Sequence, residues 1–588
     1  MKRFTKLMLT LALLVLAVGG VNAQTALEFD AFGKATIAKG ALVGAGGLTY
    51  NAETGALSSD GTEGTLTLEF TEPVDLKNLK HFNVTNSGQT GDILDCLKFF
   101  DEDGEQINQW NSIKLSNTWN PNGIDDNATN AFLNNKPVKK LVWPSAANDS
   151  KNGKTATITS VEFSLKTIAC SKAGETQLNT LPWNKKDGSG TATPDWNMNG
   201  SSDTYYGNYS GDATHYADLT SYSELRVYCK DNNTGFRCFF INEAGTATNQ
   251  IHTSASTWND VEKYYSLNLS TIEKWEGKVA LKAMKAENGG GPGERFVTNI
   301  VVYNAPAANA PQYILTGAGF LLPAAKAALA DASVTSFDAT GVTGITTNSE
   351  AGRTLLTSAN PNCLFLGSVG NGKLANDKNV VDGSTCANLE LVDGKPFNAP
   401  ADFTATAAKF TKTVGEAGYA TMVIPFSAAL PAGVEAYNIT GNDGNVLTTS
   451  TAEAIETNKP VMLKNAGDYN FTASNVEIAA TTDGVQNNGL LYGAYTAKAV
   501  PTANTYVLQK QGDDVNFYKA IDGLTVNPFR AYLTASAGAR LTFDFNETNG
   551  IKSVETTADN RIYNIQGVRV DNPTKGLYIV NGKKAIVK

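Results

Sequence analysis

Short apolar stretches that alternate with polar positions run along most of the chain. They are rich in Val, Thr, Phe, Tyr and Ile, and Asn, Gly, Asp and Ser interrupt them about every 8–12 residues. This pattern is typical of sandwich and barrel strands, and only PAAKAALADA at 323–332 has helical character. We predict a mostly β protein, with tandem jelly-roll-like β-sandwich domains followed by further small β modules and a short C-terminal β tail.

An internal repeat divides the first half of the chain. The segment that begins DLKNLKHFNVTN at Asp75 runs in parallel, with a gap of one residue, to the segment that begins DLTSYSELRVYC at Asp218. The matched pairs are Leu76 with Leu219, Phe82 with Leu225, Val84 with Val227, and Cys96 with Cys238. Each copy has a later strand (138–143 and 278–284) and closes on a similar one (156–165 and 295–304). Because the matched positions alternate, as one buried strand face does, the repeat predicts two tandem β-sandwiches.

Composition sets the boundaries between the predicted domains. All seven Trp lie before residue 276, and the Pro/Ala-rich stretch NAPAANAPQ at 304–312 ends the first half. The predicted order is a signal peptide (1–23), a first sandwich (24–168), a second sandwich (169–306), a linker (307–312), a small β module (313–409), a β domain (410–548) and a C-terminal tail (549–588).

The N-terminal segment predicts export. Three basic residues among the first six precede an apolar run from Leu7 to Val18, and Val21-Asn22-Ala23 is a small-x-small cleavage pattern. The run is shorter than the ~20 residues that span a bilayer, and no later segment is apolar enough to span one. The formal net charge of −9 argues against nucleic acid or an anionic membrane as a partner. We expect a secreted or cell-surface protein with no transmembrane segment.

Six Cys in an exported chain permit disulfides without forming a dense framework. Cys229 and Cys238 lie at equal distances from a turn centred on Asn233-Thr234, so we expect them to face each other across a hairpin. They are then either bridged or two reduced, buried thiols. Cys363 and Cys386 are a weaker candidate pair.

The stretch LPWNKKDGSGTATPDWNMNGSSDTYYGNYSGDATHYADL holds Trp and Tyr among Gly, Ser and Asn, with almost none of the aliphatic companions of a core strand. A sugar stacks its C–H face on an exposed aromatic ring, and polar side chains bond its hydroxyls. The candidate carbohydrate-binding residues are Trp183, Trp196, Tyr205, Tyr206, Tyr209, Asp195 and Asn197, with Trp110 and Trp119 as weaker candidates. The alternative is that some of these rings cap the end of the sandwich. Trp143, inside a strand, is expected in the core.

Catalytic signatures are scarce. The three His, at 81, 215 and 252, are not at metal-ligand spacing from Cys, Asp or Glu, and no G-x-S-x-G elbow appears. GGGPGE at 289–294 precedes a strand, which favours a surface loop over a phosphate-binding one. The acidic turns 101–106 and 123–129 are candidates for a structural calcium, but DEDGE lacks the full calcium-loop spacing, which favours solvated turns. We expect no enzyme activity and no cofactor beyond such a calcium.

Two parts of the chain resemble known protein families. The D-L-(x)n-L-x-V strand, hairpin and terminal T-x-I/V-x-x-V strand of the repeat resemble jelly-roll carbohydrate-binding modules of the galactose-binding-like superfold. The elements at Gly418–Thr421, Pro425-Phe426, Asn527–Leu533 and Asn360–Phe365 resemble the accessory β modules of large Bacteroidetes-type secreted surface proteins. In that family these modules accompany glycan-active or adhesive domains and have no catalytic role.

The end of the chain, from NGIKSVE at 549 through IYNIQGVRV to KGLYIVNGKKAIVK, is similar to the C-terminal sorting domain of the type IX secretion pathway. Gly567 to Val570 matches its G-R-x-V element, with Val568 in place of the usual Arg, and Lys575 to Ile579 matches K-G-L-Y-I. The tail is basic in an acidic chain, and Asn581-Gly582 suits a two-residue hairpin turn. The resemblance implies that secretion machinery reads the tail during passage across the outer membrane. The alternative is that these strands close the preceding β domain.

Three hypotheses for function follow. The preferred one is a secreted, non-catalytic glycan-binding protein that recognises a polysaccharide through exposed aromatic residues on its jelly-roll domains. The second is a structural or adhesive cell-surface protein without a glycan site. The third is a glycoside hydrolase or polysaccharide lyase.

Overall fold

The computed structural model describes residues 24–76, 78–107, 136–178, 183–185, 191–192, 205–206, 215–229, 234–242, 251–252, 256–260, 262–272, 278–288, 297–307, 310–345, 352–481, 485–536, 538–544, 562–564, 568–580 and 583–587. The predicted signal peptide lies outside them. Strands dominate, and α1 (Pro323–Ala330) is the only α-helix among these residues, which confirms the mostly β prediction and the single helical segment. No helix in this part of the chain is long and apolar enough to cross a membrane.

The first sandwich is built around two long strands. One group of strands pairs along β4, and a second group pairs along β8. A short pairing of β4 with β8 joins the groups into one eight-stranded sheet that folds over itself. The strands are β1 (Gln24–Thr25), β2 (Lys34–Ala38), β3 (Leu42–Tyr50), β4 (Ala56–Val74), β5 (Leu79–Ser87), β6 (Lys98–Phe100), β7 (Val138–Ser145) and β8 (Thr155–Leu165). Trp143 is buried and stacks on Phe82 with ring centroids 5.9 Å apart, so the prediction that it lies in the core is confirmed.

The second sandwich has two separate sheets. Five strands form one sheet in the order β10-β21-β15-β19-β18, and the other has the order β12-β11-β14-β20-β16-β17 with β13 also on β20. The strands are β10 (Glu175–Gln177), β11 (Trp183–Lys185), β12 (Thr191–Ala192), β13 (Tyr205–Tyr206), β14 (His215–Asp218), β15 (Glu224–Cys229), β16 (Thr234–Asn242), β17 (Ile251–His252), β18 (Thr257–Asn259), β19 (Tyr264–Asn268), β20 (Lys278–Asn288) and β21 (Val297–Tyr303).

The internal repeat predicted from the sequence is confirmed by strand pairing. In the first sandwich Phe82 and Val84 of β5 pair with Phe163 and Val161 of β8. In the second, Leu225 and Val227 of β15 pair with Val302 and Ile300 of β21, at the matching positions of the final strand. The strand pair β6–β7 likewise corresponds to β16–β20. The matched residues Leu76 and Leu219, Phe82 and Leu225, and Val84 and Val227 are all buried.

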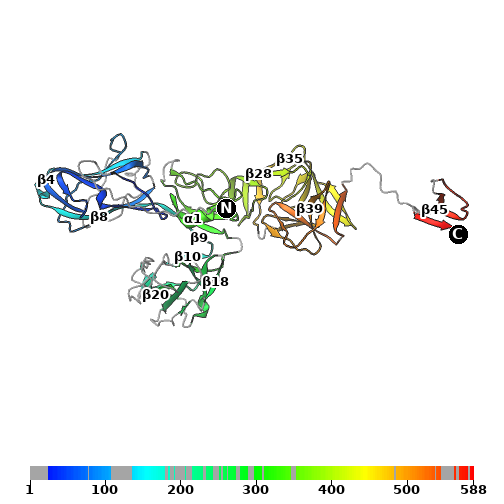
Figure 1. Cartoon of the computed structure of the whole chain (residues 1–588), viewed down its shortest axis with the longest axis horizontal. Coiled ribbons are helices and arrows are strands. Elements are labelled where there is room, and N and C mark those ends of the chain that lie inside the picture. The colour runs from blue at the N-terminus through cyan, green and yellow to red at the C-terminus, as the bar shows by residue number, and fades with distance from the viewer. Residues whose placement is uncertain are drawn as a thin grey trace.

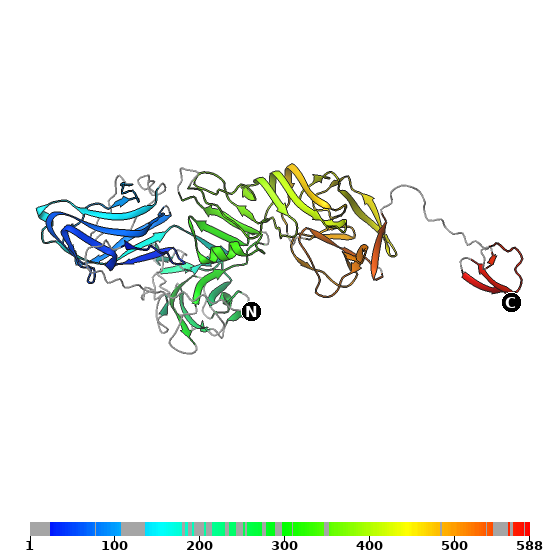
Figure 2. The same ribbon diagram turned by 45° about the horizontal axis from the view of Figure 1, so that its top comes forward.

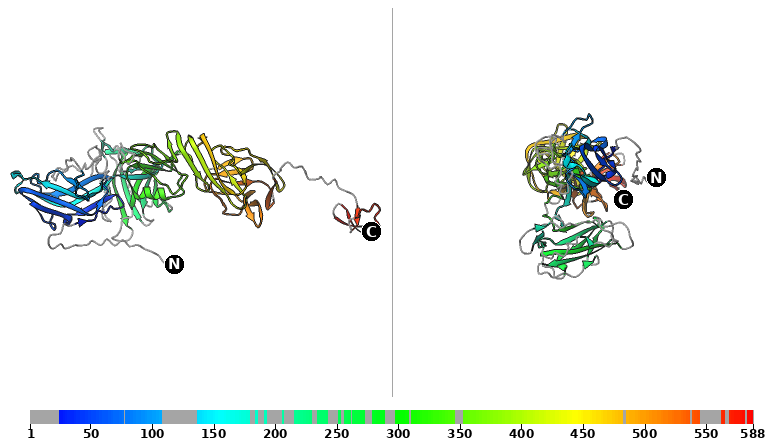
Figure 3. Two further views of the ribbon diagram at one scale, coloured as in Figure 1. Left: turned by 90° about the horizontal axis from the view of Figure 1, so that it is seen from above. Right: turned by 90° about the vertical axis from the view of Figure 1, so that its left-hand side faces the viewer.

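The second sandwich is inserted into the unit that follows it. β9 (Thr167–Lys172) straddles the boundary expected between the two sandwiches, but it pairs with neither of them. It pairs instead with β22 (Tyr313–Gly317) and β23 (Phe320–Leu321), on the far side of the second sandwich in sequence. Figure 1 shows the second sandwich (β10, β18, β20) below β9 and α1, and Figure 3 (right) shows it projecting away from the row formed by the other units.

A nine-stranded sheet forms the centre of the molecule, in the order β23-β9-β22-β24-β25-β26-β27-β28-β35. Its middle strands β22, β24, β25 and β26 are short and parallel. The remaining bounds are β24 (Ser336–Val342), β25 (Leu364–Leu366), β26 (Val380–Asp382), β27 (Thr385–Val392), β28 (Phe403–Val414) and β35 (Gly467–Ile478).

Buried asparagines connect the turns between these short strands. The Asn379 side chain donates to the carbonyl oxygens of Pro361 (2.8 Å) and Glu390 (3.0 Å) and accepts from the Glu390 amide at 2.8 Å. Asn362 does the same with the backbone of Val392 and Lys395. An Asn side chain can satisfy donors and acceptors of buried backbone at once, so it permits turns to be stacked without unpaired polar groups.

The last large unit is a ten-stranded sheet in the order β29-β34-β31-β32-β43-β40-β39-β42-β37-β36, seen in yellow and orange in Figure 2. It shares one apolar cluster with the nine-stranded sheet, which joins Leu364 and Cys386 of that sheet to Phe529. A second cluster, which includes Leu447, Tyr506 and Phe517, belongs to the ten-stranded sheet itself. The strands are β29 (Tyr419–Met422), β31 (Glu435–Asp443), β32 (Val446–Thr451), β34 (Val461–Lys464), β36 (Val485–Asn488), β37 (Leu491–Ala494), β39 (Thr505–Gln511), β40 (Asp514–Lys519), β42 (Arg530–Thr534) and β43 (Arg540–Asp544). Two small two-stranded sheets accompany it, β30 (Ala428–Ala429) with β33 (Ala454–Ile455) and β38 (Lys498–Ala499) with β41 (Thr525–Val526).

The motif segments 418–421 and 527–533 meet in this unit. The Thr421 hydroxyl accepts from the Ala531 amide at 2.9 Å and donates to the Ala531 carbonyl oxygen at 3.1 Å. Phe529 has a φ of +62° and a fully buried ring, which is a strained backbone for a non-glycine residue. That conformation points its ring into the shared core, next to Arg530 at the start of β42.

The C-terminal tail is a three-stranded antiparallel sheet of β44 (Ile562–Asn564), β45 (Gly576–Val580) and β46 (Lys583–Val587). Val580 pairs with Lys583, so the predicted two-residue connection between the last strands is confirmed. Within the described residues these strands pair only with one another. That pairing speaks against the alternative in which they close the ten-stranded sheet.

Candidate functional site

The predicted carbohydrate-binding residues fall on the seven-stranded sheet of the second sandwich, as far as the structure describes them. Trp183 lies on β11, and Tyr205 and Tyr206 lie on β13. β14 connects the two, because it pairs with β11 and then with β20, the strand to which β13 also pairs. Only the backbone of these three residues is described. The candidates outside the described residues are Trp196, Tyr209, Asp195, Asn197, Trp110 and Trp119.

The prediction that Cys229 and Cys238 face each other across a hairpin is wrong. Cys229 pairs with Val297 in the five-stranded sheet, whereas Cys238 pairs with Met284 in the other sheet. The chain therefore crosses from one layer to the other between them. Their side chains lie outside the described part, so a bridge between layers stays a prediction. Cys363 and Cys386 are free and buried, so the second candidate pairing is also wrong.

The acidic turn at 101–106 is organised by its own chain. The Asp101 carboxylate accepts from the Glu105 amide at 2.8 Å and forms an ion pair of 2.6 Å with Lys136. Its pKa is lowered, first by the hydrogen bond from Lys136. Both carboxylate oxygens thus have protein partners, and within the described residues no group of three His, Cys, Asp or Glu could hold a metal ion. The turn at 123–129 lies outside them.

The structure brings a different set of residues together where the second sandwich joins the central sheet. The chain enters through Ala173-Gly174 and returns through Asn304, whose amide donates to the Gly174 carbonyl oxygen at 2.9 Å. Gly174 has a φ of +81°, and a Cβ there would lie 2.1 Å from the Asn304 carbonyl oxygen. Only glycine fits this position, which holds the two connections side by side.

A cleft of about 1020 Å³ lies beside this junction. One wall is apolar and comes from α1 and the residue before it, with Leu322, Pro323 and Ala327. A second part of the lining carries polar groups of β9 and β10, with Lys172 and Glu175. Tyr228 at the end of β15 and Tyr313 at the start of β22 also line it. The cleft therefore combines an apolar surface, two phenol rings and hydrogen-bonding groups.

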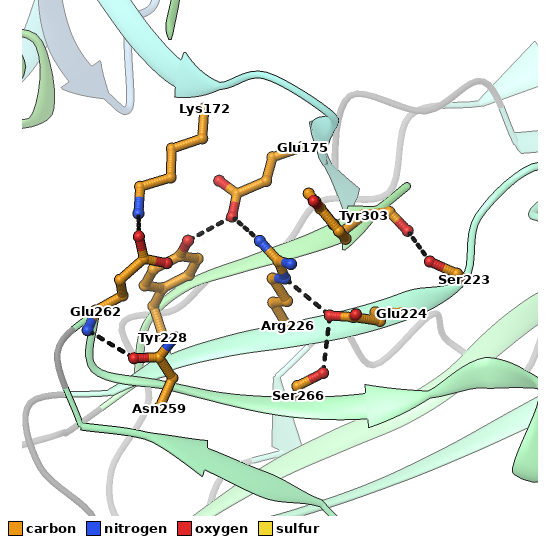
Figure 4. Close-up of polar contacts among 10 residues, drawn as sticks. All are labelled: Lys172, Glu175, Ser223, Glu224, Arg226, Tyr228, Asn259, Glu262, Ser266 and Tyr303. Atoms are coloured by element: carbon orange, nitrogen blue, oxygen red, sulfur yellow. Dashed lines mark hydrogen bonds and ion pairs between the residues drawn. The ribbon is translucent and has the colours of Figure 1, made fainter. Parts of the chain in front are cut away.

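A buried ion cluster supports the polar wall (Figure 4). Arg226 donates to Glu175 at 3.2 Å and to Glu224 at 3.0 Å, and its guanidinium lies over the Tyr303 ring, 3.2 Å from the centroid. The Arg226 and Glu175 side chains are only 10% and 5% exposed. Tyr228 donates its hydroxyl to Glu175. Since Leu225 and Val227 face the core, this cluster occupies the opposite face of β15, which is solvated in most sandwiches.

Burial keeps the phenols and the thiol of the cleft in their neutral forms. It raises the pKa of Tyr313 to about 12, and burial and the charge of Glu175 raise the pKa of Cys170 to about 12. The Tyr228 pKa lies far above its usual value because of burial and the hydrogen bond to Glu175. Lys172 forms an ion pair with Glu262, and Asp331 accepts from the Ser333 amide at 2.8 Å. The charged groups have partners within the protein, so the cleft suits a neutral, polyhydroxylated ligand better than an ion.

No family model and no curated protein matches this chain. The site therefore has to be interpreted from its own geometry.

Sequence reasoning missed the cleft because its residues come from distant segments. The one local signal was Arg226, a charged residue in the middle of the apolar strand ELRVYC. Such a residue either points to solvent or needs a buried partner, and the sequence does not say which.

Proposed function

We propose that this protein is a secreted, non-catalytic glycan-binding protein whose second sandwich recognises a polysaccharide. The observation that carries the proposal is that β11, β13 and β14, which come from the aromatic, Gly/Ser/Asn-rich stretch, lie in one sheet. Strands of one sheet hold rings at fixed spacings, and a row of rings with a fixed spacing matches the repeat of a sugar chain.

The junction cleft supports the same proposal from a second position. Its apolar wall and its phenol rings match the C–H faces of sugars, and its polar wall offers partners for hydroxyl groups. Two weak contacts on one polymer reinforce each other through their effective concentration.

The alternative proposal is a structural or adhesive surface protein. The observation that favours it is the arrangement of units in a row with one sandwich projecting sideways (Figure 1), which suits a spacer that presents a domain. In either proposal the C-terminal tail serves as a basic signal for secretion machinery. Its folding as a separate three-stranded sheet supports this role.

Affinity electrophoresis of the mature chain through gels that contain xylan, glucan, mannan or pectin tests the proposal. We expect one polysaccharide class to retard the protein, and we expect Trp183→Ala and Trp196→Ala to reduce the retardation. Replacing an aromatic ring that stacks on a sugar weakens binding by about tenfold, which is about 1.4 kcal/mol.

Trp258→Ala is the matched control. Trp258 lies on β18 in the other sheet of the same sandwich, where its ring packs on Tyr265 with centroids 4.7 Å apart. Its removal should leave retardation unchanged. Absence of retardation in all gels would favour the structural or adhesive proposal instead.

A further inference from the structure

A second pocket lies on the ten-stranded sheet, far from the second sandwich in sequence. Its volume is about 390 Å³, and residues of β29, β39, β40, β41 and β42 line it. The polar groups on its walls include Gln509, Lys510, Thr525, Asn527 and Arg530. This volume lies within the range of small-ligand pockets, about 300–1,000 Å³.

The charge of this pocket is opposite to that of the protein. Among the described residues that line it are two cations, Lys510 and Arg530, and no Asp or Glu. The whole chain has a formal net charge of −9. A cationic pocket in an acidic chain attracts anions selectively, because the rest of the surface repels them.

A buried network behind the pocket wall anchors Arg530. Asp393 receives Arg530 Nη2 on one oxygen at 2.6 Å and Lys412 Nζ on the other at 3.2 Å. One carboxylate therefore faces two cations. Lys412 is fully buried and makes its other hydrogen bond to the Thr421 carbonyl oxygen at 2.9 Å. The Arg530 side chain remains 36% exposed and lines the pocket.

We propose that this pocket binds the carboxylate of an acidic sugar, with Arg530 and Lys510 on the carboxylate. The planar guanidinium matches a carboxylate in geometry, and Lys510 supplies a second charge at the rim. Gln509, Thr525 and Asn527 are the partners for the ring hydroxyls. The carboxylate is inferred from the pocket alone, whereas the choice of a sugar as its carrier rests on the proposed glycan-binding function.

The protonation of Lys412 is coupled to this site. Burial lowers the pKa of Lys412 to about 7, with Arg530 lowering it and Asp393 raising it. These are the two charged groups that face it. An anion beside Arg530 would offset the repulsion between the two cations and raise the Lys412 pKa. Binding near neutral pH would then take up protons.

Isothermal titration of the mature chain with trigalacturonate tests the proposal, with the fully methyl-esterified trimer as the uncharged match. We expect the acid form to bind at least about tenfold more tightly at low ionic strength. Lys510→Gln should weaken binding about threefold or more, and Arg530→Gln about tenfold. The control is Lys519→Gln, which removes the same charge from an exposed position of β40 that does not line the pocket.

Equal affinity for the acid and its ester, or equal effects of Lys510→Gln and Lys519→Gln, would overturn the proposal. Lys510 is exposed on β39, so its replacement does not endanger folding. Titrations in two buffers with different heats of ionisation should also reveal proton uptake, which binding elsewhere would not produce. If trigalacturonate fails while a neutral polysaccharide still retards the protein, the pocket inference falls and the proposed function stands. If trigalacturonate binds and neutral polysaccharides do not, the pocket inference stands and the assignment of glycan binding to the second sandwich falls.

Discussion

Replacing Asp393 by alanine is expected to lower the free energy of unfolding of the C-terminal β unit by about 3–5 kcal/mol. Asp393 is the shared counter-ion of Lys412 and Arg530, and the Lys412 side chain is completely buried. Without the carboxylate, Arg530 would lose its counter-ion, and Lys412 would have to carry an unpaired buried charge or give up its proton. Removing one partner of a buried ion pair costs more than the pair itself contributes, because it leaves an uncompensated charge.

The thiol of Cys386 provides a local probe for this effect. It is fully buried and free, and it belongs to the same apolar cluster as Phe410 and Phe529. Labelling of Cys386 across a urea series, read by peptide mass spectrometry, should shift to lower denaturant in Asp393→Ala. Asp513→Ala is the control, since Asp513 is exposed on the same unit and should change stability by less than about 0.5 kcal/mol. Coincident labelling curves for the two variants would refute the prediction.

Lys412→Met, in contrast to Asp393→Ala, should not lower the free energy of unfolding. Asp393 keeps Arg530 in this variant, and an apolar side chain of similar length replaces a buried charge, so stability at neutral pH should be equal or higher. In the native chain the Lys412 pKa falls from 10.5 to about 7 because of burial. Between these values the unfolded chain binds a proton that the folded chain does not, so native stability should rise with pH across this window. The slope is at most about 1.4 kcal/mol per pH unit.

Calorimetric unfolding at several pH values measures this difference. The native protein should gain stability relative to Lys412→Met as the pH rises from about 7 toward about 10.5. Below the lower value both states carry the proton, and the full cost of burying the charge persists. If the difference in free energy of unfolding between the two proteins stayed constant from about pH 7 to 10.5, the lowered pKa of Lys412 would be contradicted.

Glu175→Gln is the second substitution with a large expected effect. It should destabilise the second sandwich by about 1.5–3 kcal/mol, because Arg226, which is only 10% exposed, would keep Glu224 but lose the second of its two charged partners. Tyr228 would keep an acceptor for its hydroxyl, so the loss reports on the charge rather than on the hydrogen bond. Removing the Glu175 charge should also lower the pKa of Cys170, which Glu175 raises in addition to burial. Faster labelling of Cys170 at a fixed pH would show this.

Glu262→Gln is the matched control for Glu175→Gln. Both glutamates appear in Figure 4, but Glu262 is 36% exposed and pairs with Lys172 instead of with Arg226. An exposed ion pair contributes about 1 kcal/mol or less. Thermal unfolding of the two variants should therefore differ clearly, and equal losses would show that burial of Glu175 has no energetic consequence.

The sequence predicted those features that depend on neighbouring residues. The alternation of apolar and polar residues, with the turn residues, predicted the strands, and the internal repeat predicted two related sandwiches. Asn581-Gly582 predicted the length of the last hairpin connection. The cysteine hairpin failed because equal spacing about a turn does not distinguish a hairpin from an arch that crosses between layers. Cys229 and Cys238 lie in different sheets.

Features that depend on distant segments could not be predicted. The sequence of β9 has the same pattern as the other strands. No neighbouring residue indicates that it pairs with β22 and not with a strand of either sandwich. Arg226 and Lys412 are buried charges whose partners come from other parts of the chain. Composition alone pointed to the aromatic candidates. That β11 and β13 share one sheet depends on their pairing with β14 and β20, which composition does not show.

The insertion of the second sandwich between β9 and β22 sets an order for synthesis. The ribosome releases β9 before the inserted sandwich and releases β22 only after it, so the centre of the nine-stranded sheet waits for its partner. Because both ends of the inserted sandwich meet at Gly174 and Asn304, its closure brings β22 back to β9 and removes most of the entropic cost of joining them. If translation pauses within the inserted sandwich, β9 remains an unpaired strand edge. Because such an edge can pair with another chain, we expect aggregation to be most probable at this stage of synthesis.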